Sequence, residues 1–262
     1  MILEARDVSF SYGKGLALDH LSLGVEQGSL LCLMGRNGSG KTTLLDCLMG
    51  ALTPTGGSVY LLDQPITQYR RHEIARHVSY LPQIHGITFP YTVREMVMLG
   101  RLAYASAFGS PRPEDEEACD EAMQAAGVYE FRDKSYSSLS GGEIRLVLLA
   151  RALCQQAEII LMDEPTVYLD FRNEMLFLRR IAELTAQNGT TVVMATHSPN
   201  HAFYFESVNV SVQAALLEKG HLVAVGAPSD VITPAAAADV FGVEAEVASA
   251  GGLRNLIIKN PL

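Results

Sequence analysis

The sequence predicts an α/β protein in which a core of buried strands is joined to an antiparallel β part and interrupted by a helical insertion. Strand-like and helical patterns alternate along the 262 residues. Continuous apolar runs at 29–34 and 158–162 are typical of strands buried on both faces. Over 92–134 the chain changes character, and helical patterns follow one another without strands. We therefore expect two halves of one α/β core on either side of a helical insertion at about 86–152.

The first half begins with apolar alternation that predicts an antiparallel pair of strands at 2–10 and 18–26. The turn Tyr12-Gly13-Lys14-Gly15 joins them. The buried strand 29–34 leads into a Gly-rich loop and a helix. The further expected elements are a helix from about Lys41 to Gly50, a loop at Thr53–Gly57, and strands at Val59–Leu62 and His77–Leu81.

The insertion opens at Thr92, which has Glu95 at capping-box spacing. Pro111 and Pro113 break the chain, and the acidic segment Glu114–Glu121 suits the start of another helix. Beyond the insertion we expect a strand at 158–162, a helix at 173–187, a strand at 190–195, a hairpin across Lys219-Gly220, a short helix near 235–241 and two final strands.

The composition is that of an ordinary globular protein, with 48% hydrophobic and 19% charged residues. No apolar run approaches the roughly 20 residues of a membrane helix, and the charged start is unlike a signal peptide. We therefore expect a soluble chain. A net charge of −9 disfavours broad binding to nucleic acid. The four cysteines show no CxxC pattern and are expected to be small core or surface residues in a reducing cytosol.

A glycine-rich loop carries the strongest chemical signal. Gly35-Arg-Asn-Gly-Ser-Gly-Lys41-Thr42 fits the pattern G-x-x-x-x-G-K-[ST] between an apolar strand and a helix. In such a loop, backbone N–H groups close around phosphate oxygens at the positive end of the helix. Lys41 would neutralise the β- and γ-phosphates, and the Thr42 hydroxyl would ligate Mg²⁺. A glycine-rich turn without a ligand would leave the Lys-Thr pair unexplained.

Polar residues also follow three other apolar strands. Asp163 and Glu164 end the run at 158–162, where Asp163 could hold Mg²⁺ through water and Glu164 could polarise an attacking water. Gln83 and His197 follow two further strands, at the carboxyl ends where open α/β sheets bind ligands. Taken singly, the two carboxylates fit a solvated turn, and Gln83 and His197 fit ordinary loop residues.

The segment Leu139-Ser-Gly-Gly-Glu143 precedes a helix that runs to about Cys154. Ser140 would be the N-cap, and Glu143 has the reciprocal position. The start of this helix is either another anion site or a well-capped helix and nothing more.

Together these segments resemble the ATP-binding cassette of ABC transporters over roughly residues 1–230. The motifs occur in the order of that family, and LSGGE about 15 residues before the strand ending in Asp-Glu is specific to it. In order, they are an aromatic residue (Tyr12), Walker A (Gly35–Thr42), a Gln loop (Gln83), the signature (139–143), Walker B (159–164), a D loop (Thr166, Leu169, Asp170) and a switch histidine (His197).

The resemblance implies a P-loop NTPase of RecA-like fold that hydrolyses ATP with Mg²⁺. It implies a cassette at 1–242, with the helical subdomain at about 86–152, and a C-terminal extension at 243–262. By resemblance, Glu164, His197 and Gln83 are catalytic, and Thr42, Gln83 and Asp163 hold the metal. The implied ATP-binding residues are Tyr12, Gly35, Asn37, Gly38, Ser39, Gly40, Lys41, Thr42, Thr43, Ser140, Gly141, Gly142 and Asp170.

The family also implies partners. Two cassettes face head to tail, and each ATP lies between the Walker A of one and the signature of the other. A single set of motifs here favours a homodimer. Leu81-Pro-Gln83 and the stretch Thr88–Arg101 are similar to importers of metal chelates: siderophores, haem, cobalamin and, in some branches, molybdate. That stretch would face a membrane permease, and a substrate-binding protein would act indirectly. The expected location is the cytoplasmic face of the cell membrane.

Some residues depart from the family pattern. Ile144-Arg145-Leu146 stands where a basic-Gln-basic run is usual, and the two apolar residues fit burial of the helix. Tyr168 occupies a D-loop position that usually holds a small residue. Two alternatives stay open: a soluble ATPase of the kind that assembles iron–sulfur clusters, and an exporter cassette.

Overall fold

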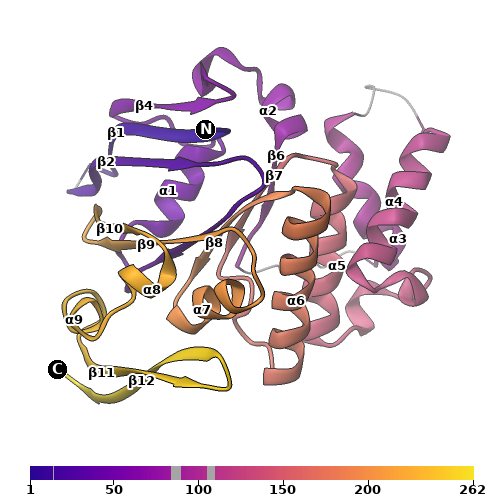
Figure 1. Ribbon diagram of the computed structural model, residues 1–262. Helices are drawn as coiled ribbons and strands as arrows, with labels where there is room; N and C mark the ends of the chain where they lie inside the picture. The colour runs from indigo at the N-terminus through magenta and orange to yellow at the C-terminus, as the bar shows by residue number, and fades with distance from the viewer. Residues whose placement is uncertain (14, 84–89, 105–109) are drawn as a thin grey trace. The chain divides into compact units, whose positions relative to one another are not determined.

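The computed structural model describes residues 1–13, 15–83, 90–104 and 110–262 (Figure 1). The chain forms two compact units. Unit 1 consists of Met1–Tyr69 and Ala182–Leu262, and unit 2 consists of Arg70–Ile181.

Unit 1 is built on strands that are buried on both faces. β3 (Leu30–Met34) pairs in parallel with β8 (Thr191–Thr196) on one side and with β9 (Val212–Glu218) on the other. β10 (His221–Gly226) returns antiparallel to β9, as the predicted hairpin requires. Every residue of β3 and β8 is buried, which explains their unbroken apolar sequence. The helices of this unit are α1 (Lys41–Leu48), α7 (Pro199–Ser207), α8 (Pro228–Val231), α9 (Pro234–Ala236) and a π-helical turn (Ala237–Phe241).

An antiparallel sheet completes the amino-terminal part of unit 1. β1 (Leu3–Ser11) lies between β2 (Leu16–Val25) and β4 (Gly56–Leu61), and the short β5 (Gln64–Pro65) pairs with β4. The predicted hairpin at 2–10 and 18–26 is thereby confirmed; Lys14 of its turn lies outside the described residues. A single 3₁₀ turn, Ile66–Gln68, follows.

The chain ends in a separate hairpin, which confirms the two final strands. β11 (Val243–Ala250) and β12 (Leu253–Pro261) pair only with each other among the described strands. The hairpin lies against α7, where the Asn200 side chain accepts a hydrogen bond from the Leu256 N–H at 2.7 Å. Leu256 is the one buried residue of β12. An isolated two-stranded hairpin is marginal in water, so this contact holds the tail in place.

Unit 2 combines a parallel strand pair with a group of helices. β6 (Val78–Leu81) pairs with β7 (Ile159–Asp163). α3 (Val93–Met98), α4 (Pro113–Ala126) and α5 (Gly141–Cys154) lie side by side (Figure 1). The remaining elements are α2 (Arg71–His77), 3₁₀ turns at Leu99–Ala103, Tyr129–Phe131 and Tyr136–Ser138, and α6 (Phe171–Asn188), whose last residues belong to unit 1.

The sequence prediction missed some short elements. The strand expected from His77 begins one residue later, because His77 is the last residue of α2, which the sequence analysis did not predict. Glu73 accepts a hydrogen bond from the Arg70 N–H and so fixes the start of α2. α7 was also missed, although Pro199 stands at its first position, where proline is favoured.

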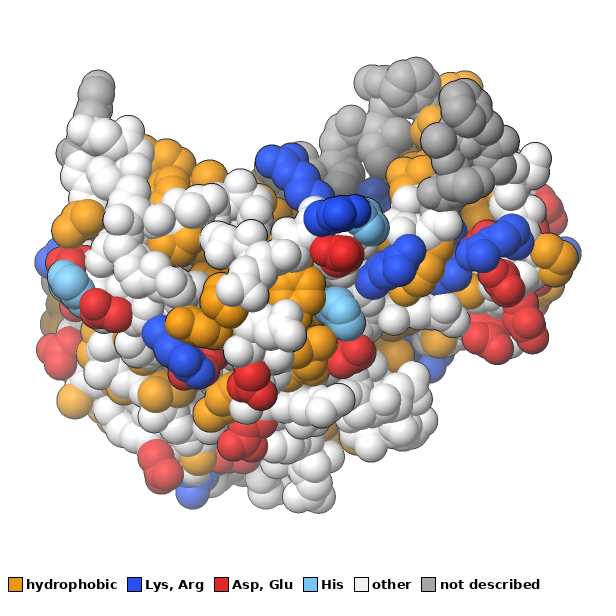
Figure 2. Space-filling view, turned by 90° about the horizontal axis from the view of Figure 1, so that it is seen from above, with side chains coloured by type: hydrophobic (Ala, Val, Ile, Leu, Met, Phe, Trp, Pro, Cys, Tyr) orange, Lys and Arg blue, Asp and Glu red, His pale blue; other side chains and the backbone are white. Residues whose placement is uncertain are grey.

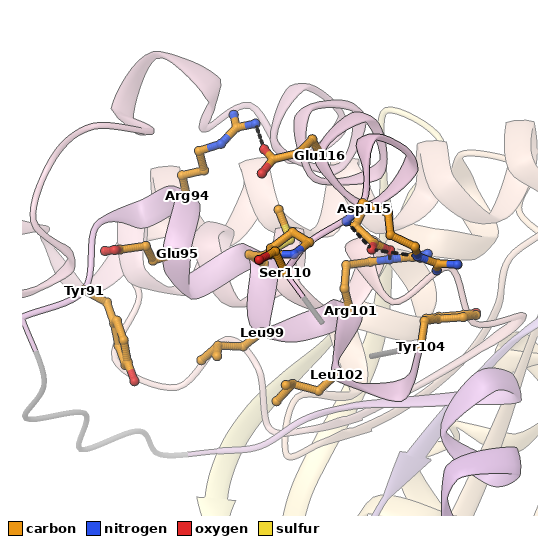
Figure 3. Close-up of a pocket in the computed structure, with 13 residues that line it drawn as sticks. Tyr91, Arg94, Glu95, Leu99, Arg101, Leu102, Tyr104, Ser110, Asp115 and Glu116 are labelled. Carbon is orange, nitrogen blue, oxygen red and sulfur yellow. Dashed lines mark hydrogen bonds and ion pairs between the residues drawn. The ribbon is translucent and has the colours of Figure 1, made fainter. Parts of the chain in front are cut away.

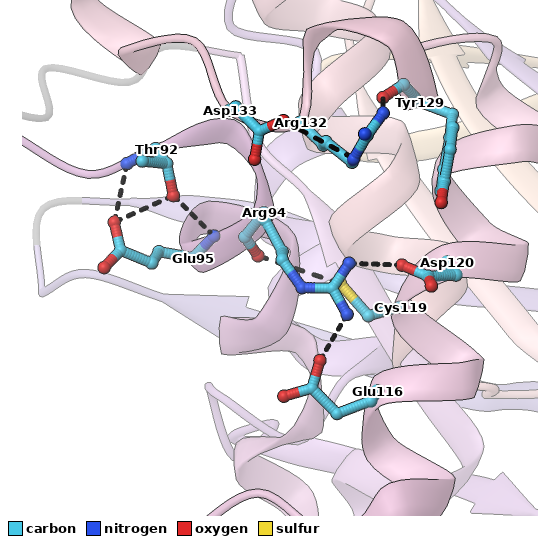
Figure 4. A network of polar contacts seen from close by, with 9 residues as sticks. All are labelled: Thr92, Arg94, Glu95, Glu116, Cys119, Asp120, Tyr129, Arg132 and Asp133. Atoms are coloured by element: carbon cyan, nitrogen blue, oxygen red, sulfur yellow. Dashed lines mark hydrogen bonds and ion pairs between the residues drawn. The ribbon is translucent and has the colours of Figure 1, made fainter.

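Arginines tie the helices of unit 2 together (Figure 4). Arg94 of α3 donates to Glu116 and Asp120 of α4, and the predicted Thr92–Glu95 cap is present at the start of α3. Arg101 donates from Nε to Asp115 Oδ1 at 2.8 Å, and both side chains are largely buried.

The four cysteines are free and buried, as expected of core residues. Over the described part of the chain, every helix falls short of the length and apolar content needed to cross a bilayer.

Replacing Asp115 with Asn tests the buried ion pair. Hydrogen bonds from the Arg112 N–H and from Arg101 lower the pKa of Asp115 from 3.8 to about 2. The fold therefore favours the carboxylate, whose contribution is complete well above pH 4 and is lost as pH falls toward 2. Removing one partner of a buried pair should cost about 3 kcal/mol at pH 7, measured by urea unfolding.

The pH dependence of stability and a control variant test the same ion pair. Between pH 5 and pH 3 the wild type should lose more stability than Asp115→Asn. Glu114→Gln, which breaks the exposed pair with Arg112, should change stability by less than about 1 kcal/mol. Equal stability of Asp115→Asn and wild type at pH 7 would contradict the role given to the pair.

Two glycines in the turn between β3 and α1 give a matched test of packing. Gly40 has φ +105°, and a Cβ placed on it would lie 2.6 Å from the Ala17 carbonyl oxygen. Gly38 has φ +81° but nothing within 4 Å. Gly38→Ala should therefore cost only backbone strain of about 1–2 kcal/mol. Gly40→Ala should cost about 1–3 kcal/mol more because the backbone must shift. Urea unfolding of the two variants measures the difference, and equal losses would refute it.

Candidate functional site

The loop between β3 and α1 folds around a buried lysine. Lys41 is only 6% exposed, and its Nζ donates to the carbonyl oxygens of Gly35 at 2.8 Å and Arg36 at 3.3 Å. Gly35, at φ +154°, could not carry a side chain, because a Cβ there would lie 2.3 Å from the Leu217 carbonyl oxygen. The ammonium group is therefore held inside the curve of the loop that the sequence pattern predicts.

The start of α1 suits a phosphate group. Gly40, its N-cap, provides no side-chain cap, and the first turn contains no acidic residue. The N–H groups of that turn and the positive end of the helix dipole are thus not offset by a carboxylate on the helix itself. The Ser39 hydroxyl is buried and has no hydrogen-bond partner among the described residues. A phosphate oxygen is an acceptor that this hydroxyl and these N–H groups could share.

Tyr12 lies beside the same helix. Its ring packs edge-on against Phe10 with centroids 4.9 Å apart, and its hydroxyl is 3.4 Å from Thr43 Oγ1. The side chain is 66% exposed. An exposed, positioned aromatic ring next to a phosphate loop can stack on a purine base.

His197 leaves the sheet at the same edge as the glycine loop. Thr196 pairs with Met34 across β8 and β3, so His197 and Gly35 follow directly from paired residues. The turn after β8 is fixed by Thr196 Oγ1, which accepts from the Ser198 N–H at 3.1 Å and bonds His201 Nδ1 at 2.7 Å. The His197 side chain is exposed at this edge.

Unit 2 brings Gln83 and Glu164 into contact. Leu81 and Met162 pair across β6 and β7, and the two polar residues follow at the same edge. Gln83 Nε2 donates to Glu164 Oε2 at 3.0 Å. Glu164 has φ +44°, a left-handed conformation that non-glycine residues rarely adopt and that is common at functional sites. Asp163 beside it is only 4% exposed.

Ser140 caps α5, as its spacing to Glu143 predicts. The Ser140 N–H and hydroxyl both donate to Glu143 Oε2, at 2.8 and 2.7 Å. These hydrogen bonds lower the pKa of Glu143 and keep it ionised. The cap is confirmed, and the exposed Ser140 stands at the positive end of the helix.

The signature and the D loop meet at Gly142. A Cβ on Gly142 would lie 2.6 Å from Asn173 Nδ2 of α6. Asn173 is in turn held by Asp170, whose Oδ1 accepts the Asn173 N–H at 2.8 Å. Tyr168 stands in this loop with φ +69° and is 83% exposed.

One buried residue was not predicted. Of the run Ile144-Arg145-Leu146, the arginine is 7% exposed and the two apolar residues are half-buried, so the most buried side chain of the run is the charged one. Arg145 follows Gly142 by three residues and shares its buried helix face. The three-residue spacing from Gly142 is the sequence signal that could have predicted the burial of Arg145.

A groove of about 460 Å³ opens on the helices of unit 2 (Figure 3). The apolar side chains of Leu99 and Leu102 lie between Tyr91 and Tyr104 along this groove. Basic side chains gather around apolar surface on the side of the molecule that carries α2, α3 and α4 (Figure 2). Six of the lining residues belong to the predicted stretch Thr88–Arg101, of which Thr88 and Phe89 lie outside the described residues. Leu102 and Tyr104 follow that stretch, and the other lining residues lie at 110–112 and in the first turn of α4. The lining residues are Tyr91, Arg94, Glu95, Met98, Leu99, Arg101, Leu102, Tyr104, Ser110, Pro111, Arg112, Asp115 and Glu116.

The predicted site residues divide between the two units. Unit 1 holds Tyr12, the loop at 35–43 and His197, whereas unit 2 holds Gln83, the signature, Walker B and Asp170. Within the described residues, no three His, Cys, Asp or Glu side chains cluster in a way that could hold a metal ion. The oxygen ligands expected for Mg²⁺ are a hydroxyl, an amide and a single carboxylate.

Comparison with known proteins shows the family of the chain. The model of the family described as ABC transporter matches residues 18–167, more than half of the chain. The hemin import ATP-binding protein HmuV of Thermobifida fusca is 37% identical over 95% of this chain and 85% of its own length. The ferric enterobactin transport ATP-binding protein FepC of Escherichia coli is 33% identical over 99% of this chain and 90% of its own.

Solved structures give the same result. The structure of a metal-chelate type ABC transporter in an inward-facing conformation is similar to this chain with a TM-score of 0.84. It has 25% sequence identity, over 98% of this chain and 97% of that one. An ATP-binding cassette solved as a dimer with ADP and phosphate has a TM-score of 0.72 and 25% identity, over 86% of this chain and 98% of that one. The chain belongs to the ATP-binding cassette family of ABC transporters.

Proposed function

We propose that this chain is the ATP-hydrolysing subunit of a membrane importer that takes up metal chelates, a class that includes siderophores, haem and cobalamin. The observation that carries the proposal is similarity over nearly the whole chain to the ATP-binding subunits for hemin and ferric enterobactin. The fold and the phosphate loop supply the ATPase, and the groove of unit 2 supplies the surface for a permease.

ATP binds first to unit 1. The N–H groups of the glycine loop and the Lys41 ammonium hold its phosphates, and the Ser39 hydroxyl finds an acceptor there. The Tyr12 ring stacks on adenine. When bound, Mg²⁺ would offset the phosphate charge; Thr42 and Gln83 would hold it, with Asp163 acting through water. The further phosphate-loop residues are Gly35, Asn37, Gly38, Gly40 and Thr43.

Glu164 activates the water that attacks the γ-phosphate. The hydrogen bond that the Gln83 amide donates to Glu164 Oε2 orients this carboxylate toward that water. His197 holds the γ-phosphate and the water. Lys41 stabilises the negative charge that develops on the phosphate oxygens, the main term in phosphoryl transfer.

Two copies of the chain complete two sites. The signature residues Ser140, Gly141 and Gly142 reach the nucleotide bound to the other copy, and Asp170 crosses the interface. The capped start of α5 supports this, because it presents Ser140 on the surface at a helix N-terminus. A homodimer is the simplest assembly for a chain with one set of motifs.

The permease inserts a cytoplasmic helix into the groove of unit 2. Leu99, Leu102 and the two tyrosines offer apolar contact, and the arginines at the rim offer charge. The chain then lies on the cytoplasmic face of the membrane, and a substrate-binding protein delivers cargo to the other face. The Gln83 loop transmits the opening and closing of the cassettes.

Replacing Glu164 with Gln should separate binding from hydrolysis. The amide keeps the side-chain shape but cannot act as a base. ATP turnover should fall on the order of a hundredfold or more, comparable to the loss of a key charge-stabilising group. ATP binding should be retained. The measurement is phosphate release by the chain with its co-purifying membrane partner, beside nucleotide titration.

Glu158→Gln is the matched control, because Glu158 begins the same segment but bonds His77 at 3.3 Å instead of Gln83. Its turnover should equal that of the wild type. Full turnover in Glu164→Gln would remove Glu164 from the catalytic role.

A charge placed in the groove should release the permease. Leu102 is 68% exposed, so Leu102→Asp should fold, yet a carboxylate there cannot be buried under a partner helix without a large desolvation cost. We expect loss of the co-purifying membrane protein and unchanged ATPase activity of the isolated chain. Val223→Asp, at a position of β10 that is 52% exposed, should keep the partner. If both variants keep it equally, the groove is not the docking site.

A further inference from the structure

Arg145 is buried in an unusual way. It lies in the second turn of α5 with only 7% of its surface exposed. Its Nη1 donates to the Pro82 carbonyl oxygen at 2.9 Å, and its Nη2 donates to the carbonyl oxygen of Gln83. Among the described residues no carboxylate pairs with it, and burial lowers its pKa.

A buried guanidinium without a carboxylate is expensive to keep. Removing its charge from water costs free energy that two carbonyl groups only partly return. The planar fork, however, can donate to two successive carbonyl oxygens at once, which a lysine ammonium cannot do in a fixed geometry.

The held peptide belongs to the residue that contacts the catalytic carboxylate. The backbone carbonyl of Gln83 is fixed by Arg145, and its side-chain amide donates to Glu164 Oε2 at 3.0 Å. The direction of the Gln83 side chain depends on the orientation of its backbone. Arg145 therefore sets, through one residue, the position of an amide that orients Glu164.

The surroundings leave this linkage room to adjust. A cavity of about 170 Å³ is lined by Gln83, Arg145, Val167 and Tyr168, together with Gly141, Ile144 and Leu148. It thus borders the Gln loop, the signature helix and the D loop. A close-packed interior would not tolerate a shift of α5, whereas a side chain at the edge of a cavity can follow one.

We propose that Arg145 is a positioning residue that couples α5 to Glu164 through Gln83. The inference rests on the proposed function, in which Ser140 at the start of α5 engages the nucleotide of the other copy. Engagement of Ser140 shifts α5, Arg145 carries the shift to the Gln83 backbone, and the Gln83 amide adjusts the carboxylate of the same chain. Engagement of the nucleotide at one ATP site is thereby transmitted to the catalytic carboxylate at the other site.

The decisive experiment is a double-mutant cycle in the full chain. Arg145→Met removes the fork, and kcat should fall on the order of 10–100-fold, the penalty of a misplaced catalytic group. The Kd for ATP should change less than about twofold, because the phosphate loop is untouched. Arg145→Gln, which restores amide donors, should recover part of kcat. Arg145→Met combined with Gln83→Ala should lose no more than Gln83→Ala alone.

Arg151→Met is the matched control. Arg151 also lies on α5, where it is half-buried, but the hydrogen bonds of the described residues do not join it to the Gln loop. It should lower thermal stability without changing kcat of the folded protein. Additive losses in the double variant, or equal kcat effects in Arg145→Met and Arg151→Met, would overturn the proposal.

Hydrogen exchange tests the linkage without ATPase activity. The backbone N–H groups of Ser79, Tyr80, Leu81 and Gln83 should exchange at least tenfold faster in Arg145→Met than in the wild type, with no such change in Arg151→Met. Unchanged exchange would overturn the proposal. A wild-type chain that hydrolyses no ATP would overturn the proposed function instead, and the exchange result would then decide the role of Arg145 by itself.

Discussion

The functional residues depend on complete burial of the parallel strands. Side chains on both faces of β3, β7 and β8 are removed from water, so a slip along these strands would draw the polar loop residues that follow them into the core. In unit 1, Gly35 and His197 follow paired residues of β3 and β8; in unit 2, Gln83 and Glu164 follow β6 and β7. A hydrophobic constraint thus fixes the starting points of four polar loops.

Polar contacts then refine what the strands have placed. Lys41 is turned back onto the carbonyl groups of its own loop, and Glu164 meets the Gln83 amide. Ser140 and Glu143 satisfy each other at the start of α5. Each arrangement joins residues that are close in sequence or on neighbouring strands, so little additional ordering is required.

Much of this was predictable from sequence because the signals are local. The apolar runs gave the buried strands, and the spacing of Thr92 to Glu95 and of Ser140 to Glu143 gave two helix starts. The burial of Arg145 was not predicted, because its partners are more than sixty residues away and are backbone carbonyls, which leave no mark in the sequence. The short α2 and α7 lack a strong periodic pattern, and the groove depends on the packing of three segments.

The backbone at Glu164 has an evolutionary consequence. A glycine or an asparagine would adopt φ +44° at lower cost than a glutamate, so the most stable sequence at this position is not the one that the chain carries. Selection for thermal stability alone would favour glycine or asparagine at this position, and the carboxylate would be lost. The strained glutamate therefore reflects a trade-off between stability and catalytic turnover. A stabilised variant of this protein would have to gain its stability at other positions.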